Sequence, residues 1–451
     1  MKISHINSAT TVIETNGIKI LTDPWFGEGI YYNSWKTFPP VDIKPEEYCD
    51  IDYIYISHIH PDHFSSDSMS RLDKKTPVLI LDFGEQFLKR KLQFMGFNNI
   101  IEIGHNQKYH LKNSVYINIL AADNCNPEVC GKLFGCFFEE NNVAKTYTID
   151  SMCVINNDEF VVVNTNDCPY PIMRETLELV NEQYSKIDFL MVGYTGASLY
   201  PFAMVEYDEA KMKDARDRTK RKGLNFAVDY ITTLSPKYYF PFAGTYVLNS
   251  ENWNLNEFSP IPTLTEAKQY VDQKLESASQ ISTGVLLNSG SHFDLSSQSE
   301  SSVYKQYSDR DKREYIANVL SKESYTYVQD ELKSISDFKE IIKPAFERFK
   351  NKVIEINYVS ESRIYIEFGR HCLEIDISSQ EPKYIVHEEL NFEIHENHHY
   401  FILDARLFYR TLSGPRYAHW NNIEIGALLK LKRSPDHYQQ GIHFGLCYLH
   451  K

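Results

Sequence analysis

A cluster of residue types that bind metal ions follows an apolar stretch near the N-terminus. After IDYIYIS (residues 51–57), the chain carries His58, His60, Asp62 and His63 in the spacing H-x-H-x-D-H. Neutral imidazole suits zinc or iron, and a carboxylate adds hardness and negative charge. Side chains this close can hold two metal ions only if alternate residues point to different centres. The spacing therefore assigns the first two histidines to one metal ion and the Asp62–His63 pair to a second.

The elements that must position this cluster can be inferred from the flanking residues. The apolar run predicts a buried strand, with the metal-ligating residues on the turn at its C-terminal end. Upstream, the segment Ile3–Phe26 alternates like two strands around the turn Asn16-Gly17 and contains Asp23 near its end. Motif and segment together resemble the metallo-β-lactamase superfamily. The resemblance implies an α/β fold, an αββα sandwich, in which Asp23 holds the ligand histidines in one tautomer and ring orientation.

The same resemblance implies metal ligands at the ends of later strands. Where many members carry a third-block histidine, this sequence has Asp123, with Glu128 as a weaker candidate for the same role. Asp167, at the end of the strand predicted over 159–168, takes the place of a carboxylate that bridges two metal ions. A carboxylate in place of an imidazole hardens the site and favours iron or manganese over zinc.

Other residues are candidates for contact with a substrate. The stretch 27–48 contains Trp35, is rich in aromatics and prolines and has no clear period, which predicts a loop beside the metal turn. This loop is either a substrate wall or a packed surface loop. The segment 236–248, where a last ligand histidine is frequent, contains none, and the nearest later histidine is His292. Near the C-terminus the candidates are His419, Trp420 and Asn421, for which a capped turn is an equally good interpretation.

Blocks along most of the chain resemble the CMP-N-acetylneuraminate hydroxylase family, in the same order. They include DPWF, WKTFPP, YIYISHIHPDHF, DNCNPE, NTNDC, GYTGASLYPF, FPFAGTYV and WNNIEIGALLKLKRSPDHY. The resemblance runs from Lys2 to about Tyr438 and implies iron-dependent oxygenation of a nucleotide-activated sugar. The N-terminal Rieske iron–sulfur domain of that family has no counterpart before Ile3. Electrons are therefore expected from an external ferredoxin or reductase.

Composition narrows the class of protein. The formal net charge of -14 over 451 residues disfavours nonspecific binding to nucleic acid or to an anionic membrane. The sequence has no apolar run long enough for a membrane span and no signal-peptide core, so we expect a cytoplasmic protein. The 8 cysteines are spread along the chain and do not form a disulfide framework. Three of them match no common zinc or iron–sulfur spacing: Cys125, Cys130 and Cys136.

The length predicts more than one domain. We expect a metallo-β-lactamase-fold catalytic domain over residues 1–288, a linker and helices over 289–340, and an α+β domain over 341–451. The last domain weakly resembles the sterol-carrier-like modules attached to some metallo-β-lactamase proteins. Alternating residues at its end predict a final hairpin formed by 423–433 and 442–450.

Three classes of function follow from these residues. The first is an oxygenase with two divalent metal ions, iron favoured and zinc or manganese as alternatives, acting on a nucleotide-activated sugar or a similar small polar metabolite. The second is a dinuclear hydrolase of a phosphodiester, phosphoester, lactone or amide bond, in which paired metal ions activate a water and Asp62 manages its proton. The third, a non-catalytic binding protein, is remote because the early ligand residues are all present.

Overall fold

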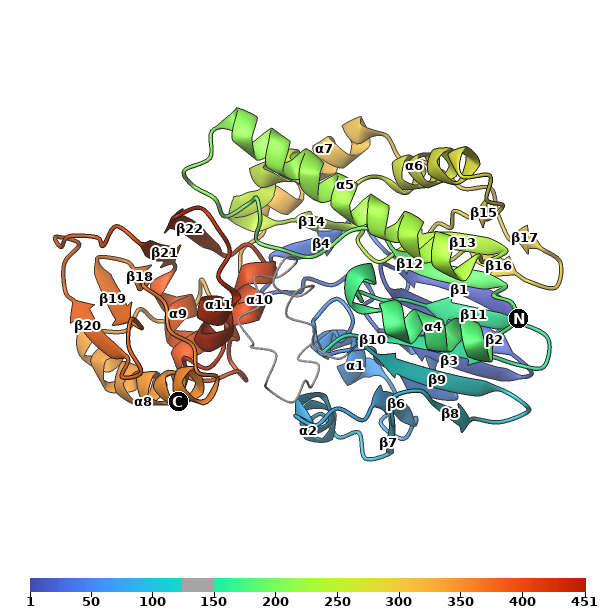
Figure 1. The fold of residues 1–451 in the computed structure, drawn as a ribbon, viewed down its shortest axis with the longest axis horizontal. Coiled ribbons are helices and arrows are strands. Elements are labelled where there is room, and N and C mark those ends of the chain that lie inside the picture. The colour runs from blue at the N-terminus through green and yellow to red at the C-terminus, as the bar shows by residue number, and fades with distance from the viewer. Residues whose placement is uncertain (124–148) are drawn as a thin grey trace.

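Two β-sheets stacked face to face form the larger unit of the chain in a computed structural model, which describes residues 1–123 and 149–451 (Figure 1). The first sheet has, in spatial order, β17 (Ser299–Glu300), β16 (His292–Asp294), β1 (Lys2–Asn7), β2 (Thr10–Thr15), β3 (Ile18–Thr22), β5 (Tyr53–Tyr55), β6 (Val78–Leu81) and β7 (Ile100–Ile103). The second has β15 (Thr283–Gly284), β13 (Tyr238–Phe242), β12 (Phe189–Gly193), β11 (Val161–Asn164), β10 (Ser151–Asn156), β9 (Tyr116–Ala121) and β8 (Gln107–His110).

Helices cover the outer faces of the two sheets (Figure 1). They are α1 (Ser66–Arg71) and α2 (Phe87–Phe94) on the first sheet, and α4 (Arg174–Gln183), α5 (Glu209–Leu234) and α6 (Leu264–Ser277) on the second. Successive residues of a strand point to opposite faces, so Ile20 of β3 packs between the sheets while Leu21 packs under the helices. The predicted αββα sandwich is confirmed. Among the described residues no helix combines the length and apolarity that a membrane crossing requires.

Strand directions bring the ends of several strands to one edge. Strands β3 and β5 are parallel, with Thr22 beside Tyr55, so the residues that follow them emerge together. In the second sheet β10 runs antiparallel to β11, with Cys153 opposite Asn164. The residue before β10 and the residues after β11 therefore lie at the same end of the sheet. This edge positions the candidate site.

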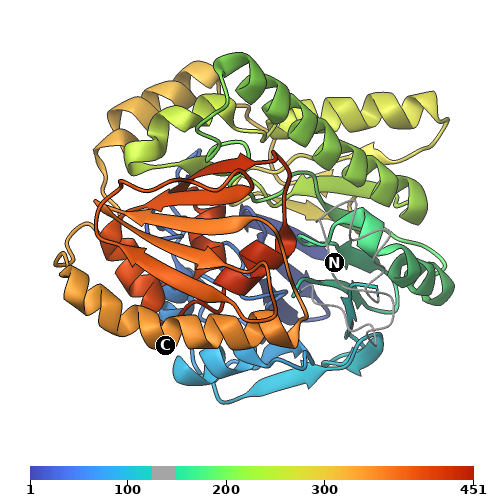
Figure 2. The same cartoon turned by 60° about the vertical axis from the view of Figure 1, so that its left-hand side comes forward.

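A separate C-terminal unit has its own sheet and its own apolar core (Figure 2). Its strands lie in the order β20 (Lys383–His387), β19 (His371–Asp376), β18 (Arg363–Phe368), β21 (His398–Leu403) and β22 (Leu429–Ser434). Its helices are α8 (Ile335–Glu355), α9 (Ala405–Leu412), α10 (Trp420–Ile425) and α11 (Gln440–Leu446). The unit mixes helices and strands as the α+β prediction requires, and its likeness to sterol-carrier modules stays a prediction.

Smaller elements join the two units. The strands β4 (Trp35–Thr37) and β14 (Tyr246–Leu248) form a two-stranded sheet beside the sandwich. The helix α7 (Asp309–Asn318) and short 3-10 helices occupy the connections: Pro45–Tyr48, Tyr170–Ile172, Ser250–Phe258 and Leu320–Lys322.

Two parts of the sequence-based layout differ from the structure. The polar stretch that begins at residue 289 is not a linker throughout, because β16 and β17 extend the first sheet, where Phe293 packs into the core between the sheets. The second arm of the expected final hairpin is helical, as α11. Its apolar residues Ile442 and Leu446 are one helical turn apart and both enter the C-terminal core, so a helix buries them together where a strand would not.

Candidate metal centre

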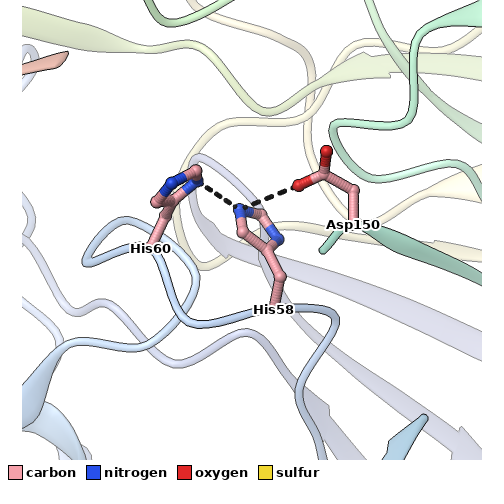
Figure 3. Close-up of side chains that lie close together, drawn as sticks. All are labelled: His58, His60 and Asp150. Carbon is pink, nitrogen blue, oxygen red and sulfur yellow. Dashed lines mark hydrogen bonds and ion pairs between the residues drawn. The ribbon is translucent and has the colours of Figure 1, made fainter. Parts of the chain in front are cut away.

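The turn after β5 brings its first two histidines together with a carboxylate from the second sheet. His58 Nε2 lies 2.9 Å from His60 Nδ1 and 3.4 Å from Oδ1 of Asp150, the residue before β10 (Figure 3). One ligand atom from each of the three residues lies within 4.8 Å of the other two. Burial lowers the pKa of His58 well below its usual value, and His63 and His60 lower it further. His58 is therefore neutral, which is the form that binds a metal ion. We call these three residues the first group.

A second group shares His58 and adds His63 and Asp167. His63 Nε2 lies 3.2 Å from Oδ1 of Asp167 and 3.5 Å from Oδ2 of Asp62. The imidazole nitrogen thus faces two carboxylates, one from its own turn and one from the loop after β11. The structure brings together five of the six predicted ligands.

Asp23 supports the second group through its contacts with Ser57 and His63. It is 0% exposed, and its Oδ1 accepts a hydrogen bond from the backbone N–H of Ser57 at 2.7 Å. Its Oδ2 lies 2.8 Å from His63 Nδ1 and accepts from the Ser57 hydroxyl at 2.7 Å. An Nδ1–H that donates to Asp23 leaves His63 Nε2 as the ligand atom. This is the geometry that the role predicted for Asp23 requires.

The charges around His63 are unbalanced without a cation. Burial by itself lowers the pKa of His63, but Asp167, Asp62 and Asp23 together raise it well above the usual value. Burial works against ionisation of Asp167 as well, and His63 nevertheless holds the pKa of that carboxyl below its ordinary value. Burial raises the pKa of Asp150 to about 6. In the metal-free protein a proton on His63 offsets the carboxylates, and a metal ion would replace that proton.

The residues fit a metal centre. His63 Nε2 is buried and has no hydrogen-bond partner within the described part of the chain, although it points at two carboxylates. An orphaned imidazole nitrogen beside carboxylate oxygens is the arrangement a divalent cation satisfies. Among the described residues the donor atoms of the two groups are nitrogen and oxygen, which suits zinc, iron or manganese.

Asp123 lies outside both groups, and Asp150 lies in the first group where Asp123 was predicted. Oδ1 and Oδ2 of Asp123 accept hydrogen bonds from the backbone N–H groups of Thr176 and Glu175, in the first turn of α4, at 2.9 and 3.0 Å. Helix N-termini offer unpaired N–H groups, and these orient this carboxylate. The available signal for Asp150 was its place directly before the buried strand Ser151–Asn156. Glu128, the weaker candidate, lies outside the described residues, as do Cys125, Cys130 and Cys136.

Two tyrosines near the second group were not predicted. Tyr31 Oη donates a hydrogen bond to Oδ1 of Asp62 at 2.5 Å, so the other carboxylate oxygen remains free to face His63. Tyr31 begins a run of three left-handed residues, with φ values of 49, 61 and 67° for Tyr31, Tyr32 and Asn33. Such backbone is costly for residues other than glycine and is found at sites where side-chain direction matters.

The second tyrosine is Tyr246 of β14. Its ring stacks on Trp35, and its hydroxyl is buried with no hydrogen-bond partner in residues 1–123 and 149–451. Burial raises the pKa of Tyr246, and Asp62 and Asp167 raise it further, so the phenol lies near both carboxylates and keeps its proton. Trp35 itself is 1% exposed between Tyr31 and Tyr246. It packs against both tyrosines, and its contact with a substrate stays a prediction.

The C-terminal unit reaches the first group through the predicted segment at residue 419. Asn421 Oδ1 lies 2.7 Å from His60 Nε2. The backbone N–H of His419 donates to Tyr32 Oη at 2.8 Å, and burial lowers the pKa of His419 to about 4. Trp420 is buried and donates from its indole nitrogen to Glu424 at 2.8 Å, so it belongs to the core of its unit. His292 lies on β16, paired with Ser4, and is in neither group.

Comparison with known proteins agrees with this fold. Residues 2–243 match the family described as beta-lactamase superfamily domain, and the chain belongs to this superfamily. The prediction of a metal-dependent enzyme of the metallo-β-lactamase fold is thereby confirmed.

Curated relatives connect the chain with redox proteins by name. It is 30% identical over 254 residues to a Rieske 2Fe-2S iron-sulfur protein of Mycobacterium tuberculosis, covering 54% of this chain and 44% of that protein. It is 24% identical over 255 residues to cytidine monophosphate-N-acetylneuraminic acid hydroxylase of Mus musculus, covering 55% of this chain and 39% of that protein. The chain thus spans less than half the length of these relatives.

Two solved structures align with part of the chain. Isothiocyanate hydrolase from Delia radicum gut bacteria aligns with a TM-score of 0.44 at 14% identity, over 65% of this chain and 99% of that one. CmlA, a diiron beta-hydroxylase from Streptomyces venezuelae, aligns with a TM-score of 0.39 at 14% identity, over 63% of this chain and 53% of that one.

Proposed function

We propose that this chain is an iron-dependent oxygenase that hydroxylates a nucleotide-activated sugar or a similar small polar metabolite. It takes electrons from an external ferredoxin or reductase. The first and second groups would hold two iron ions, which would supply the redox chemistry of this reaction.

The observation that carries the proposal is the acidity of the donor set. His58, His60 and His63 are joined by Asp150, Asp167 and Asp62, and none of the ligand atoms is sulfur. Oxygen donors harden a site and favour iron or manganese over zinc. A histidine in place of Asp150 would give the first group three imidazoles and would favour zinc. The relatives named for a Rieske centre and for a hydroxylase point to redox chemistry as well.

Side chains around the metal groups have distinct roles in this proposal. Tyr31 holds Asp62 by its Oδ1, so that Oδ2 can accept or return a proton beside the second metal position. Tyr246 offers a phenol O–H that has no partner among the described residues and can donate to a substrate oxygen. Asp23 keeps His63 in the ligand tautomer and does not take part in proton transfer.

The test combines metal analysis with a turnover assay. Protein purified without added metal or chelator should contain more iron than zinc. With a reductant, an electron carrier, O2 and nucleotide-activated sugars, it should consume O2 only when a substrate is present and add one oxygen atom, about 16 mass units, to the product. His58→Ala combined with His60→Ala is the matched control and should abolish both signals. Turnover of the same substrates without O2 and reductant would contradict the proposal.

A dinuclear hydrolase is the second candidate, and one observation favours it. Asp62 and Asp167 flank His63 Nε2 at 3.5 and 3.2 Å, as in a site that positions a water between two metal ions and accepts its proton. A preparation with two zinc ions and rapid anaerobic hydrolysis of a phosphodiester, phosphoester, lactone or amide would support this candidate.

A further inference from the structure

One side chain of the C-terminal unit contacts a predicted metal ligand from outside the metal position. Asn421 Oδ1 lies 2.7 Å from Nε2 of His60, although 361 positions separate the two residues in sequence. The opposite nitrogen of the same ring, Nδ1, lies 2.9 Å from His58 Nε2 and belongs to the first group. Asn421 therefore touches His60 on the side away from the metal position.

The helix that carries Asn421 is held at both ends by the sandwich. At the N-terminus of α10, the backbone N–H of His419 donates to Tyr32 Oη at 2.8 Å. At its C-terminus, the Ser34 hydroxyl donates to the carbonyl oxygen of Gly426. A Cβ at Gly426 would lie 3.1 Å from Cβ of Tyr31, so the two backbones are in close approach. The position of Asn421 is thus set by contacts to the loop after the first strands and not by His60 alone.

The chemistry of the contact decides the tautomer of His60. An amide oxygen only accepts hydrogen bonds, so a neutral His60 facing it must carry its proton on Nε2. Nδ1 is then a lone-pair donor available to a metal ion. If His60 carried its proton on Nδ1, that N–H would point at His58 Nε2 and consume the ligand atoms of both histidines. The outer partner of a ligand histidine typically selects the tautomer in this way.

We propose that Asn421 is a positioning residue for the first metal position: its side-chain oxygen holds His60 in the Nε2–H tautomer, so that Nδ1 can bind metal. The C-terminal unit then completes the metal centre. This inference rests on the proposed metal centre but not on the reaction that the centre performs, and it replaces the prediction that Asn421 contacts the substrate.

The first test requires no substitution at Asn421. The full chain, labelled with 15N in its histidines and free of metal, is studied by long-range proton–nitrogen NMR at about pH 8, and His60 is identified by the signals lost in His60→Gln. We expect the pattern of an imidazole protonated on Nε2. A pattern of protonation on Nδ1 would overturn the inference, whatever the variants do.

The second test measures Zn2+ affinity by competition with a chromophoric chelator. In Asn421→Ala the first position should bind Zn2+ about 10- to 100-fold more weakly, as is typical when the outer partner of a ligand histidine is lost. In Asn421→Asp the affinity should be kept, because a carboxylate also accepts from Nε2–H. Asn422→Ala is the matched control, since Asn422 hydrogen-bonds Tyr32 from the same helix.

Each outcome separates the inference from the proposed function. Equal weakening by Asn422→Ala and Asn421→Ala would show that docking of α10 matters and not the contact with His60. Unchanged Zn2+ affinity in Asn421→Ala would also overturn the inference, even if the protein proves to be an oxygenase. Weaker binding in Asn421→Ala with full rescue by Asn421→Asp supports it, even if no oxygenation is found.

Discussion

The two metal-binding groups share His58 but differ in where their supporting residues come from. The second group is supported within the first sheet and its turns, by Asp23 and Ser57 under His63 and by Tyr31 on Asp62. Each group takes one carboxylate from the second sheet, Asp150 or Asp167, but only the first group is also contacted by Asn421 from the C-terminal unit. The second position is therefore formed by the two sheets of the sandwich, whereas the first position also depends on the C-terminal unit.

This difference has a consequence for how the two positions respond to change. Supports that are buried and close in sequence remain in place as long as the sandwich folds. Supports that cross between units can be lost by a change in the docking of α10 alone. We therefore expect the two positions to be separable by substitution, with the first position the more sensitive to the C-terminal unit.

The largest effect is expected at His58, the residue that the two groups share. His58→Ala with His60→Ala removes a ligand common to both groups, so nearly all bound transition metal should be lost. Metal analysis after purification measures this, and circular dichroism checks that the C-terminal sheet is still folded. Full metal occupancy in this variant would mean that neither group binds metal.

The next effect separates the two positions. Asp150→Ala should remove about one metal equivalent from the first position, because this carboxylate lies beside His58 Nε2 in the first group. Asp167→Ala should remove the metal ion at the second position and abolish activity. If Asp167 bridges the two metal ions, both should be lost. Zn2+ titration gives the stoichiometry. If Asp167→Ala keeps two metal ions and normal turnover, Asp167 is only a turn residue.

A smaller effect is expected from the support under the second group. Asp23→Asn keeps the shape but weakens the interaction with His63 and its hold on the ligand tautomer. Affinity at the second position should fall about 10- to 100-fold, with little change at the first. Competition with a chelator measures both positions. Equal losses at the two positions would argue against separate supports.

The contact of Tyr31 with Asp62 should have a weaker influence. Tyr31→Phe removes one hydrogen bond to a carboxylate, worth about 1.5–3 kcal/mol, and the bond is partly replaced by water. We expect the affinity of the second position for Zn2+ to fall by about tenfold, with unchanged stoichiometry. Tyr246→Phe is the control, because its hydroxyl bonds no described residue. A loss of stoichiometry in Tyr31→Phe would show that the phenol is itself a ligand.

The smallest effect on the metal centre is expected from His399, which lies in the core of the C-terminal unit. Burial, together with smaller contributions from His443 and Arg433, lowers the pKa of His399 to about 2. The unfolded chain binds a proton below about pH 6.5 that the folded chain does not, so stability falls as the pH drops from 6.5 toward 4, by about 1.4 kcal/mol per pH unit. Urea unfolding of His399→Phe should lack this contribution. The same pH dependence in both proteins would assign it to other groups.

Much of the sandwich and of the turn was predictable because the relevant signals are local. The strand predicted within 51–57 is β5, and the strands around Asn16-Gly17 are β2 and β3. The predictions of secondary structure were wrong where the local sequence pattern and the tertiary contacts favour different structures. The polar stretch 289–302 has the composition of a linker, yet pairing with β1 makes part of it a strand.

The sequence by itself determined the ligand turn, since His58, His60, Asp62 and His63 are adjacent and the strand before them sets their direction. It also determined Asp23, because a parallel strand pair places the residues after β3 and β5 side by side. Only the tertiary structure decided between Asp123 and Asp150, because that choice depends on which carboxylate a helix N-terminus occupies and which one faces His58. It alone brought Asn421 to His60, since no local pattern specifies which face of one unit docks on another.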